Sequence, residues 1–209
     1  MKLLVAGATG LVGRHVVDIA LADGRVTELV APVRREIPAR PRLRAPVVDF
    51  ERLPEDADWW GADAVVCALG TTMRVAGSRP AFRRVDHDYP LAFARLALAR
   101  GTPTFVLNSA IGADSGSRFF YNRVKGDVER GLEGLGFRSL VLVRPGLIGG
   151  ERTESRPAER AGIALVGLLG PLLPRRLRIN PAARIAAAMV EAAISAPPGR
   201  HVVDAADLT

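Results

Sequence analysis

Two residue types that are rare in this chain stand one helical turn apart. The 209 residues include two tyrosines and two lysines, and Tyr121 precedes Lys125 by four positions. Chance alone gives this spacing in about 2% of chains with that composition. On a helix the two side chains share one face, where an ammonium stabilises a phenolate and makes the phenol a proton donor and acceptor near neutrality. The spacing predicts acid–base catalysis by Tyr121, tuned by Lys125.

A serine in the same part of the chain could complete such a site. Ser109 follows the apolar run at 104–107 and lies twelve residues before Tyr121. At the end of a strand its hydroxyl could hold a substrate carbonyl beside the tyrosine. A serine in a surface turn gives the same pattern, and the sequence leaves both interpretations open.

Three glycines follow the first apolar run at intervals of three. Gly7, Gly10 and Gly13 stand where a strand passes into a helix. Glycine at these positions lets the backbone turn sharply and approach a pyrophosphate, whose charge the helix N-terminus meets. The spacing alone is a weak signal, because any glycine-rich turn can produce it. The strand before it and the helix after it supply the context that a dinucleotide-binding motif needs.

The cofactor type is indicated by charged residues further along. About twenty residues after the glycines, where an acidic side chain would bind the 2′-hydroxyl of NAD, the chain has Arg34 and Arg35. Guanidinium groups fit a 2′-phosphate, so the sequence favours NADP, while the adjacent Glu36 keeps NAD possible. Asp49, at the end of a predicted strand, could bind the adenine amino group or cap its own loop.

Strands and helices alternate along the chain. Apolar runs predict strands at 2–6, 26–33, 46–50, 64–69, 104–107, 140–143 and 201–203, and helical spacing predicts helices at 11–21, 81–100, 119–135 and 182–195. Prolines at 38, 41 and 46 exclude a regular helix after the second strand, and Pro90 either kinks the second helix or begins its second half. This order predicts an α/β fold, a doubly wound parallel sheet (Rossmann fold) with a small C-terminal substrate-side region.

Composition limits the other possibilities. One domain over 1–209 is expected, with 150–209 as its C-terminal elaboration. The net charge of +7 permits a nucleic-acid partner, but the arginines are scattered and only 5% of residues are aromatic, so we expect none. The single Cys67 and the lack of a secretory leader pattern favour the cytoplasm. His15, His87 and His201 lack metal-ligand spacing, and no metal is expected.

An uncharged stretch lies in the C-terminal third. Ala161–Pro174 has 14 residues, too few to span a bilayer, so we expect no stable membrane insertion. Such a stretch must be covered, and we expect it to close the open side of the substrate pocket. A second subunit or a membrane surface are the alternatives, and a monomer or a homodimer is possible.

Taken together, these residues resemble the atypical, NAD(P)H-binding branch of the short-chain dehydrogenase/reductase superfamily. The similar segments are GATGLVG at 7–13, ALGTT at 68–72, SAIGAD at 109–114, YNRVK at 121–125 and RPG at 144–146. The likeness covers about residues 1–160. RVDHDY at 84–89 and ESRP at 154–157 resemble more narrowly the Tat-interacting-protein group, which binds NADPH.

The resemblance implies further roles. Residues lining the phosphates would be Gly7, Thr9, Gly10, Leu11, Val12 and Gly13, those flanking the ribose Leu69, Gly70 and Thr71, and those at the nicotinamide Pro145, Gly146 and Leu147. Arg34 and Arg35 would bind the 2′-phosphate. The chain departs from the superfamily at Asp86, which stands near the position of an Asn that often completes a catalytic tetrad.

Three functions are compatible with these features. The first is an NADP-dependent oxidoreductase that transfers hydride to or from a small carbonyl or alcohol, using Tyr121, Lys125 and Ser109. The second is a catalytically weak NADPH-binding regulatory or protein-interaction module. The third is a nucleotide-sugar epimerase or dehydratase, for which the roughly sixty residues after Gly150 are few.

Overall fold

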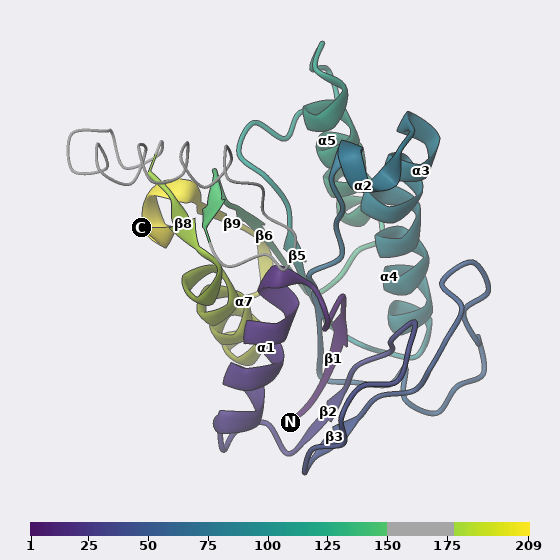
Figure 1. Cartoon of the computed structure of the whole chain (residues 1–209). Helices are drawn as coiled ribbons and strands as arrows, with labels where there is room; N and C mark the ends of the chain where they lie inside the picture. The colour runs from purple at the N-terminus through teal and green to yellow at the C-terminus, as the bar shows by residue number, and fades with distance from the viewer. Residues whose placement is uncertain (150–177) are drawn as a thin grey trace.

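The computed structural model describes residues 1–149 and 178–209. Its strands are β1 (Lys2–Ala6), β2 (Glu28–Val30), β3 (Leu43–Arg44), β4 (Ala64–Cys67), β5 (Thr104–Asn108), β6 (Ser139–Arg144), β7 (Ile148–Gly149), β8 (Asn180–Pro181) and β9 (Gly199–Asp204). Seven of them form one sheet in the order β3-β2-β1-β4-β5-β6-β9, with parallel pairing throughout, and β7 pairs with β8 separately (Figure 1).

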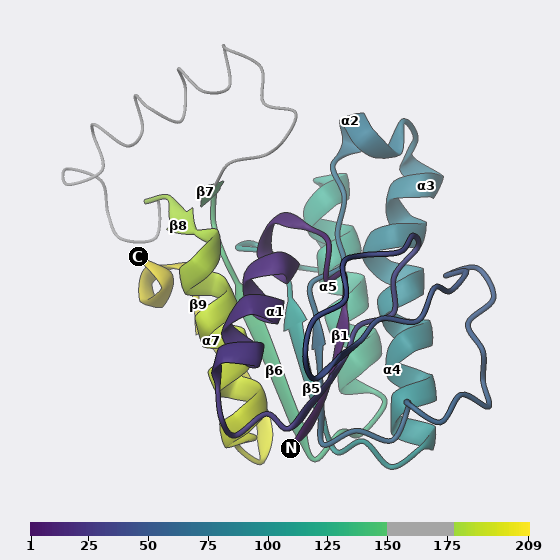
Figure 2. The ribbon, with the colours of Figure 1, turned by 60° about the horizontal axis from the view of Figure 1, so that its bottom comes forward.

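Helices cover both faces of this sheet. They are α1 (Leu11–Ala22), α2 (Met73–Ala76), α3 (Arg79–Arg83), the π-helical turn η1 (Arg84–Asp88), α4 (Tyr89–Ala99), α5 (Phe120–Glu133), α7 (Ala182–Ser195) and the 3-10 turn η4 (Ala205–Leu208). α1 and α7 pack on one face, and α4 and α5 on the other (Figure 2). The predicted doubly wound Rossmann fold is therefore confirmed.

The strands are apolar because both of their faces are covered. In β1, Leu3 and Val5 point into the layer formed with α1 and α7, whereas Leu4 points into the layer with α4 and α5. All four residues of β4 are completely buried. Burial of such a Leu or Val side chain contributes about 1.5–3 kcal/mol, so the two layers hold the carboxyl ends of the strands in fixed register.

The predicted strand at 46–50 is wrong in position. The paired strand is β3 at Leu43–Arg44, and the 46–50 stretch makes only one bridge, between Val47 and Val33. Prolines at 41 and 46 have no N–H to donate to a neighbouring strand, which leaves β3 two residues long. The extended loop predicted for this region in place of a helix is confirmed, and its Arg42 guanidinium donates to the Val26 carbonyl at 2.6 Å.

The helix around Pro90 is continuous but changes its winding. α3, η1 and α4 follow one another without a break, and Pro90 lies in the first turn of α4. Proline lacks an N–H and its ring would clash with the carbonyl four residues earlier, so a wider π-turn just before it relieves the crowding. Of the two predictions for Pro90, the start of a second half is confirmed. The π-turn also buries the side chain of Asp86.

The winding of the chain reverses between β1 and β4. The chain adds β2 and β3 on one side of β1 and then crosses back to place β4 on the other side. Loops after β1 and β4 therefore leave the carboxyl edge in opposite directions, which is where ligands bind in such sheets. In the C-terminal part of the chain, from residue 178 onward, α7 packs against α1, and β9 extends the sheet beside β6.

Some predictions are not decided by this architecture. Ala161–Pro174 lies outside the described residues, so its expected role as a cover for the pocket stays a prediction, as does the single domain over 1–209. Within the described part of the chain, no helix is both long and apolar enough to cross a membrane.

Candidate functional site

The glycine turn after β1 is held by contacts that no other residue would permit. Gly7 has φ +86°, and a Cβ there would lie 2.7 Å from the carbonyl carbon of Ala68, at the end of β4. A Cβ at Gly13 would lie 1.9 Å from the Gly7 oxygen. The Gly10 N–H donates to that same oxygen at 3.0 Å and closes the turn. At this turn the backbone after β1 therefore packs directly against the backbone after β4, with no room for a side chain at Gly7.

The first turn of α1 directly follows this glycine turn. Gly10 is the N-cap residue and has no side chain to bond the free N–H groups, and the first turn has no acidic residue. These N–H groups and the helix dipole suit an anion. Thr9 and Gly10 are exposed, whereas Val12 is buried in the core and can offer only its backbone.

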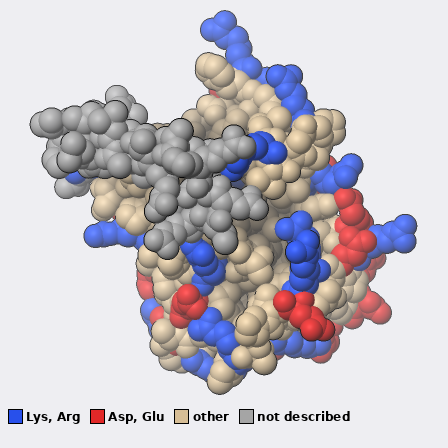
Figure 3. Space-filling view, viewed as in Figure 1, with Lys and Arg blue, Asp and Glu red and all other residues tan. Residues whose placement is uncertain are grey.

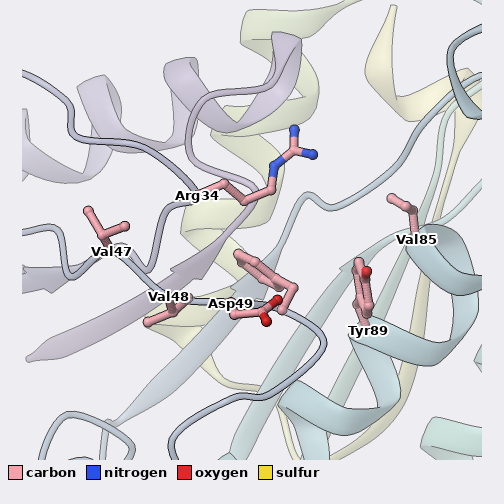
Figure 4. Close-up of a pocket in the computed structure, with 7 residues that line it drawn as sticks. Arg34, Val47, Val48, Asp49, Val85 and Tyr89 are labelled. Carbon is pink, nitrogen blue, oxygen red and sulfur yellow. The ribbon is translucent and has the colours of Figure 1, made fainter.

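A cavity of about 500 Å³ adjoins the loop after β2 (Figure 4). It is lined by Arg34, Val47, Val48, Asp49, Phe50, Val85 and Tyr89. The Arg34 side chain extends along its rim, while Arg35 is exposed outside the lining. A flat apolar ring can fit between the aliphatic and aromatic walls, with a guanidinium beside it for a phosphate. The sequence had pointed to Arg34 and Asp49; the opposite wall comes from η1 and α4.

Asp49 does cap its own loop. Its Oδ1 accepts a hydrogen bond from the Glu51 N–H at 2.9 Å, while the residue also lines the cavity. The loop-capping interpretation is therefore confirmed, and contact with an adenine amino group stays a prediction. The two roles are compatible, because a carboxylate has a second oxygen.

Tyr89 forms a fixed wall of this cavity. Its hydroxyl donates to Glu51 Oε1 at 2.6 Å, and Arg84 lies 3.3 Å from the same oxygen. Burial, reinforced by the carboxylate of Glu51, raises the pKa of Tyr89 to about 12. The phenol therefore stays protonated and is a structural group in this cavity.

Lys125 is buried beside a carboxylate that the sequence marked only as a departure from the family. Its Nζ lies 2.8 Å from Asp86 Oδ1, and Asp86 Oδ2 accepts the Thr71 N–H at 2.8 Å. Burial is the largest single influence and works against the ammonium, but the charges of Asp86 and Tyr121 and the hydrogen bond to Asp86 together outweigh it and raise the pKa of Lys125 above its usual value. Lys125 is therefore a fixed cation, tied through Asp86 to the loop after β4.

Gly70 lies next to this ion pair. A Cβ at Gly70 would be 3.5 Å from Asp86 Oδ1 and 3.9 Å from Lys125 Nζ, which is ordinary contact distance. The predicted ribose segment, Leu69–Thr71, thus lies beside the Lys125–Asp86 pair and contacts it through the Thr71 N–H and Asp86. Its role toward a cofactor stays a prediction.

Tyr121 is accessible, as a proton donor must be. It lies in the first turn of α5 with 41% of its surface exposed, and its ring packs at 5.7 Å from that of Phe82. Lys125 follows one turn later on the same helix, and the phenol contributes to raising the pKa of that lysine. The structure thus brings the two residues together as their spacing predicts.

The Ser109 side chain is buried and bonded to a carboxylate, which its position in the sequence did not suggest. It is buried, and its hydroxyl donates to Glu129 Oε1 at 2.5 Å. Arg144 holds the same carboxylate through Nη2 at 2.5 Å and Nε at 3.0 Å. The surface-turn interpretation is wrong because the residue is buried. The role in orienting a carbonyl stays a prediction, and the hydroxyl has a competing partner.

The loop between β6 and β7 carries the three residues assigned to the nicotinamide. The Pro145 carbonyl accepts the Ile111 N–H at 2.8 Å, and the Gly146 N–H donates to Asn180 Oδ1 at 2.7 Å. The Asn180 N–H in turn donates to the Leu147 carbonyl at 2.8 Å. The Leu147 side chain stays 48% exposed. The backbone of this loop is thus held on both sides, with an apolar side chain left accessible.

Other chemistry finds no support in the part of the chain that the structure describes. In residues 1–149 and 178–209, no three His, Cys, Asp or Glu side chains are arranged to hold a metal ion. Cys67 is buried and unpaired, and burial raises the pKa of its thiol to about 12. On the face shown in Figure 3, Lys and Arg are dispersed and acidic side chains lie among them.

The glycine turn, the cavity and the Lys125–Asp86 pair all lie at the carboxyl edge of the sheet, from β2 to β5. The turn offers free N–H groups and has no side chains at its glycines, and the cavity offers apolar walls with a guanidinium. A dinucleotide with a pyrophosphate between two rings fits these features.

Comparison with known proteins agrees with this description. A family model described as NAD(P)H-binding matches residues 7–134. The chain is 37% identical over 179 residues to "Protein fmp52, mitochondrial" of Emericella nidulans, covering 81% of this chain and 76% of that protein. It is 40% identical over 163 residues to "Protein HTATIP2" of Rattus norvegicus, covering 76% and 67%.

Solved structures share the fold. MoeE5 in complex with UDP-glucose and NAD superposes with a TM-score of 0.74 at 18% identity, covering 97% of this chain and 75% of that one. UDP-glucuronic acid 4-epimerase from Bacillus cereus, in complex with NAD, gives 0.69 at 15% identity, with 98% and 77% covered. At such low identity the similarity concerns the fold alone.

Proposed function

The chain belongs to the NAD(P)H-binding family, homologous to HTATIP2 and the fungal FMP52 proteins, and on that premise we propose that it is an NADP-dependent oxidoreductase. The resemblance to the atypical short-chain dehydrogenase/reductases is thereby confirmed, while the reaction is our proposal. It would transfer a hydride to or from a small carbonyl or alcohol. The observation that carries the proposal is an accessible phenol, Tyr121, one turn from a buried and fixed ammonium, Lys125.

The proposed chemistry assigns each side chain a step. The cofactor supplies or accepts the hydride when bound. As the substrate oxygen gains negative charge, Tyr121 donates its hydroxyl proton to it, and in the reverse direction the phenolate takes the proton back. Lys125 stabilises the phenolate, and Asp86 keeps the ammonium in place. Asp86 is a positioning residue here, because it touches Lys125 and Thr71 and not the reacting atoms.

The preference for NADP rests on Arg34. Its guanidinium lines the cavity, where a 2′-phosphate would form charge-assisted hydrogen bonds with it. Arg35 and Glu36 are exposed next to it, outside the lining, so we expect them to contribute less. The turn at Gly7–Gly13 would hold the pyrophosphate, and Pro145–Leu147 would contact the nicotinamide.

The wider setting belongs to the same proposal. We expect a small-molecule substrate, no nucleic-acid partner, and a monomer or a homodimer in the cytoplasm. The fungal relatives have the word mitochondrial in their names, which describes those proteins. No part of the chemistry above depends on the location.

A stopped-flow experiment tests the reaction. NADPH is mixed with the protein and a panel of aldehydes and ketones, and loss of the reduced nicotinamide is followed by absorbance. For any substrate that reacts, Tyr121→Phe keeps the ring and removes the proton, so turnover should fall by about 10²-fold or more while cofactor affinity stays within a few-fold. Unchanged turnover in this variant would overturn the assignment of Tyr121.

A second function is favoured by two contacts in the site. Asp86 offsets the charge of Lys125, and the Ser109 hydroxyl is bonded to Glu129. Both contacts weaken a proton relay, as expected of a catalytically weak module that binds NADPH for regulation or protein interaction. Tight NADPH binding without turnover of any carbonyl would support this function against the first. An epimerase or dehydratase remains a more distant prediction.

A further inference from the structure

Asn180 makes three hydrogen bonds to two separate segments of the chain. Its side-chain Oδ1 accepts the Gly146 N–H at 2.7 Å, its Nδ2 donates to the Ala205 carbonyl at 2.8 Å, and its own N–H donates to the Leu147 carbonyl at 2.8 Å. The residue is completely buried. Among the described residues it thus links the loop after β6 to the 3-10 turn η4 near the C-terminus.

Few other residue types could replace it there. A buried side chain must offer both an acceptor for Gly146 and a donor for Ala205, and an amide does this without a charge. A buried group left without its partner costs more than the bond itself contributes. The amide of Asn180 therefore fixes the backbone of Gly146 and Leu147 to the C-terminal turn.

This loop stands at one end of the site, far from the cavity. Three strands, β1, β4 and β5, separate β6 from β2 in the sheet. At the usual spacing of about 4.8 Å between strands, the loop after β6 lies about 19 Å from the loop after β2. A disturbance at Asn180 therefore acts on one half of a bound dinucleotide.

We propose that Asn180 is a positioning residue for the nicotinamide half of the cofactor. By holding the Pro145–Leu147 loop, it sets the affinity for that half and leaves the adenine half unaffected. The proposal rests on the proposed function in one respect, namely that this loop contacts the nicotinamide.

The test compares a whole cofactor with its adenine half in one protein. Asn180→Leu keeps the size of the side chain and removes both of its hydrogen bonds. Loss of the fixed loop should weaken NADPH binding by about tenfold, whereas 2′,5′-ADP, which has no nicotinamide, should bind within twofold of wild type. Isothermal titration calorimetry measures both affinities.

Thr102→Val is a matched control at the opposite end of the sheet. Thr102 is also fully buried and doubly bonded, accepting the Ala62 N–H at 3.2 Å and donating to the Trp60 carbonyl at 3.0 Å. Thr102→Val lowers stability by removing the same kind of buried hydrogen bonds, yet NADPH and 2′,5′-ADP should both bind as in wild type. If this control weakens NADPH as much as Asn180→Leu does, general destabilisation explains the result and the proposal fails.

Asn180→Asp tests the same contacts, because a carboxyl at this position can make both side-chain hydrogen bonds when it is protonated. A protonated carboxyl has one acceptor and one donor, and burial raises the pKa of a carboxyl toward the neutral range. NADPH affinity, relative to wild type at each pH, should recover as the pH falls from about 8 to about 6. An affinity ratio that stays constant over this range would contradict the proposal.

Failure of the proposed function would look different. A wild-type protein that binds NADPH and reduces no carbonyl leaves these binding measurements valid. A preference for NADH shifts the same comparison to NADH and 5′-AMP. Equal losses for the whole cofactor and its adenine half in Asn180→Leu, or no loss for either, would overturn the positioning role.

Discussion

The cavity and the Lys125–Asp86 pair differ in how their charges are held. At the cavity, Arg34 is exposed on a loop after β2, and the ion pair of Arg84 with Glu51 is about half exposed on both sides. Beside the loop after β4, Lys125 and Asp86 pair with only 5% and 1% of their side chains exposed. The difference indicates that the buried pair helps to hold the fold, whereas Arg34 stays accessible to a ligand.

The energetic reason is solvation. Exposed ion pairs contribute about 0–1 kcal/mol, because water and salt screen them and their side chains lose entropy on pairing. A buried pair contributes little when compared with a well-packed apolar pair, but removing one partner leaves an uncompensated charge at a cost of about 3–5 kcal/mol. Removing one partner of the Lys125–Asp86 pair should therefore lower stability strongly, whereas substitution of Arg34 should change only ligand binding.

The largest effect is expected at Asp86. Asp86→Asn leaves the buried ammonium of Lys125 without a counter-charge and should lower the free energy of unfolding by about 3 kcal/mol, measured by urea denaturation. Asp88→Asn, two residues later and exposed, is the control, and it should change stability by less than about 0.5 kcal/mol. Equal losses of stability in the two variants would contradict the contrast between the buried pair and the exposed charges.

A smaller effect, on binding alone, is expected at Arg34. Arg34→Ala removes a charge-assisted contact worth about 1.5–3 kcal/mol and should weaken NADPH at least about tenfold, with NADH nearly unchanged and stability within about 0.5 kcal/mol. Arg35→Ala should cost less, since Arg35 is outside the cavity lining. Arg40→Ala removes the same charge from an exposed pair with Asp18 and serves as control. Calorimetric losses that are equal for NADPH and NADH would refute the NADP preference.

The smallest effect concerns how stability depends on pH through Tyr89, in the wall of the cavity. In Tyr121→Phe, Tyr89 is the only tyrosine left, so ultraviolet absorbance follows it alone, and it should titrate near 12. Because the unfolded chain loses this proton near 10, stability should fall as the pH rises from about 10 to about 12. Glu51→Gln removes one of the two causes and should lower the pKa of Tyr89. A midpoint near 10 in the folded protein would contradict both the burial of Tyr89 and its contact with Glu51.

The sequence predicted elements well where local periodicity decides them. The helix predicted at 182–195 is α7 with the same bounds, and strand 2–6 is β1. The third strand was misplaced, because apolar residues at 46–50 look like a strand whereas hydrogen bonding to β2 selects Leu43–Arg44. β-strand identity depends on a partner elsewhere in the chain, and a short apolar run does not reveal which residues obtain one.

The sequence by itself determined the features that lie within one turn of the chain. The intervals between Gly7, Gly10 and Gly13 describe a turn that side chains would block, and the four-residue interval between Tyr121 and Lys125 gives them one helix face. Steric exclusion and the 3.6-residue period act between near neighbours, so the order of residues is enough to predict them.

Only the tertiary structure decided which distant groups meet. Asp86 became the counter-ion of Lys125, Ser109 was directed to Glu129, and Asn180 was bonded to Gly146 in the loop after β6 across 34 positions of the chain. Each of these polar groups is buried and had to find a partner, and the partner available depends on how loops and helices pack above the sheet. That packing is cooperative over the whole core, so no local pattern in the sequence specifies these pairs.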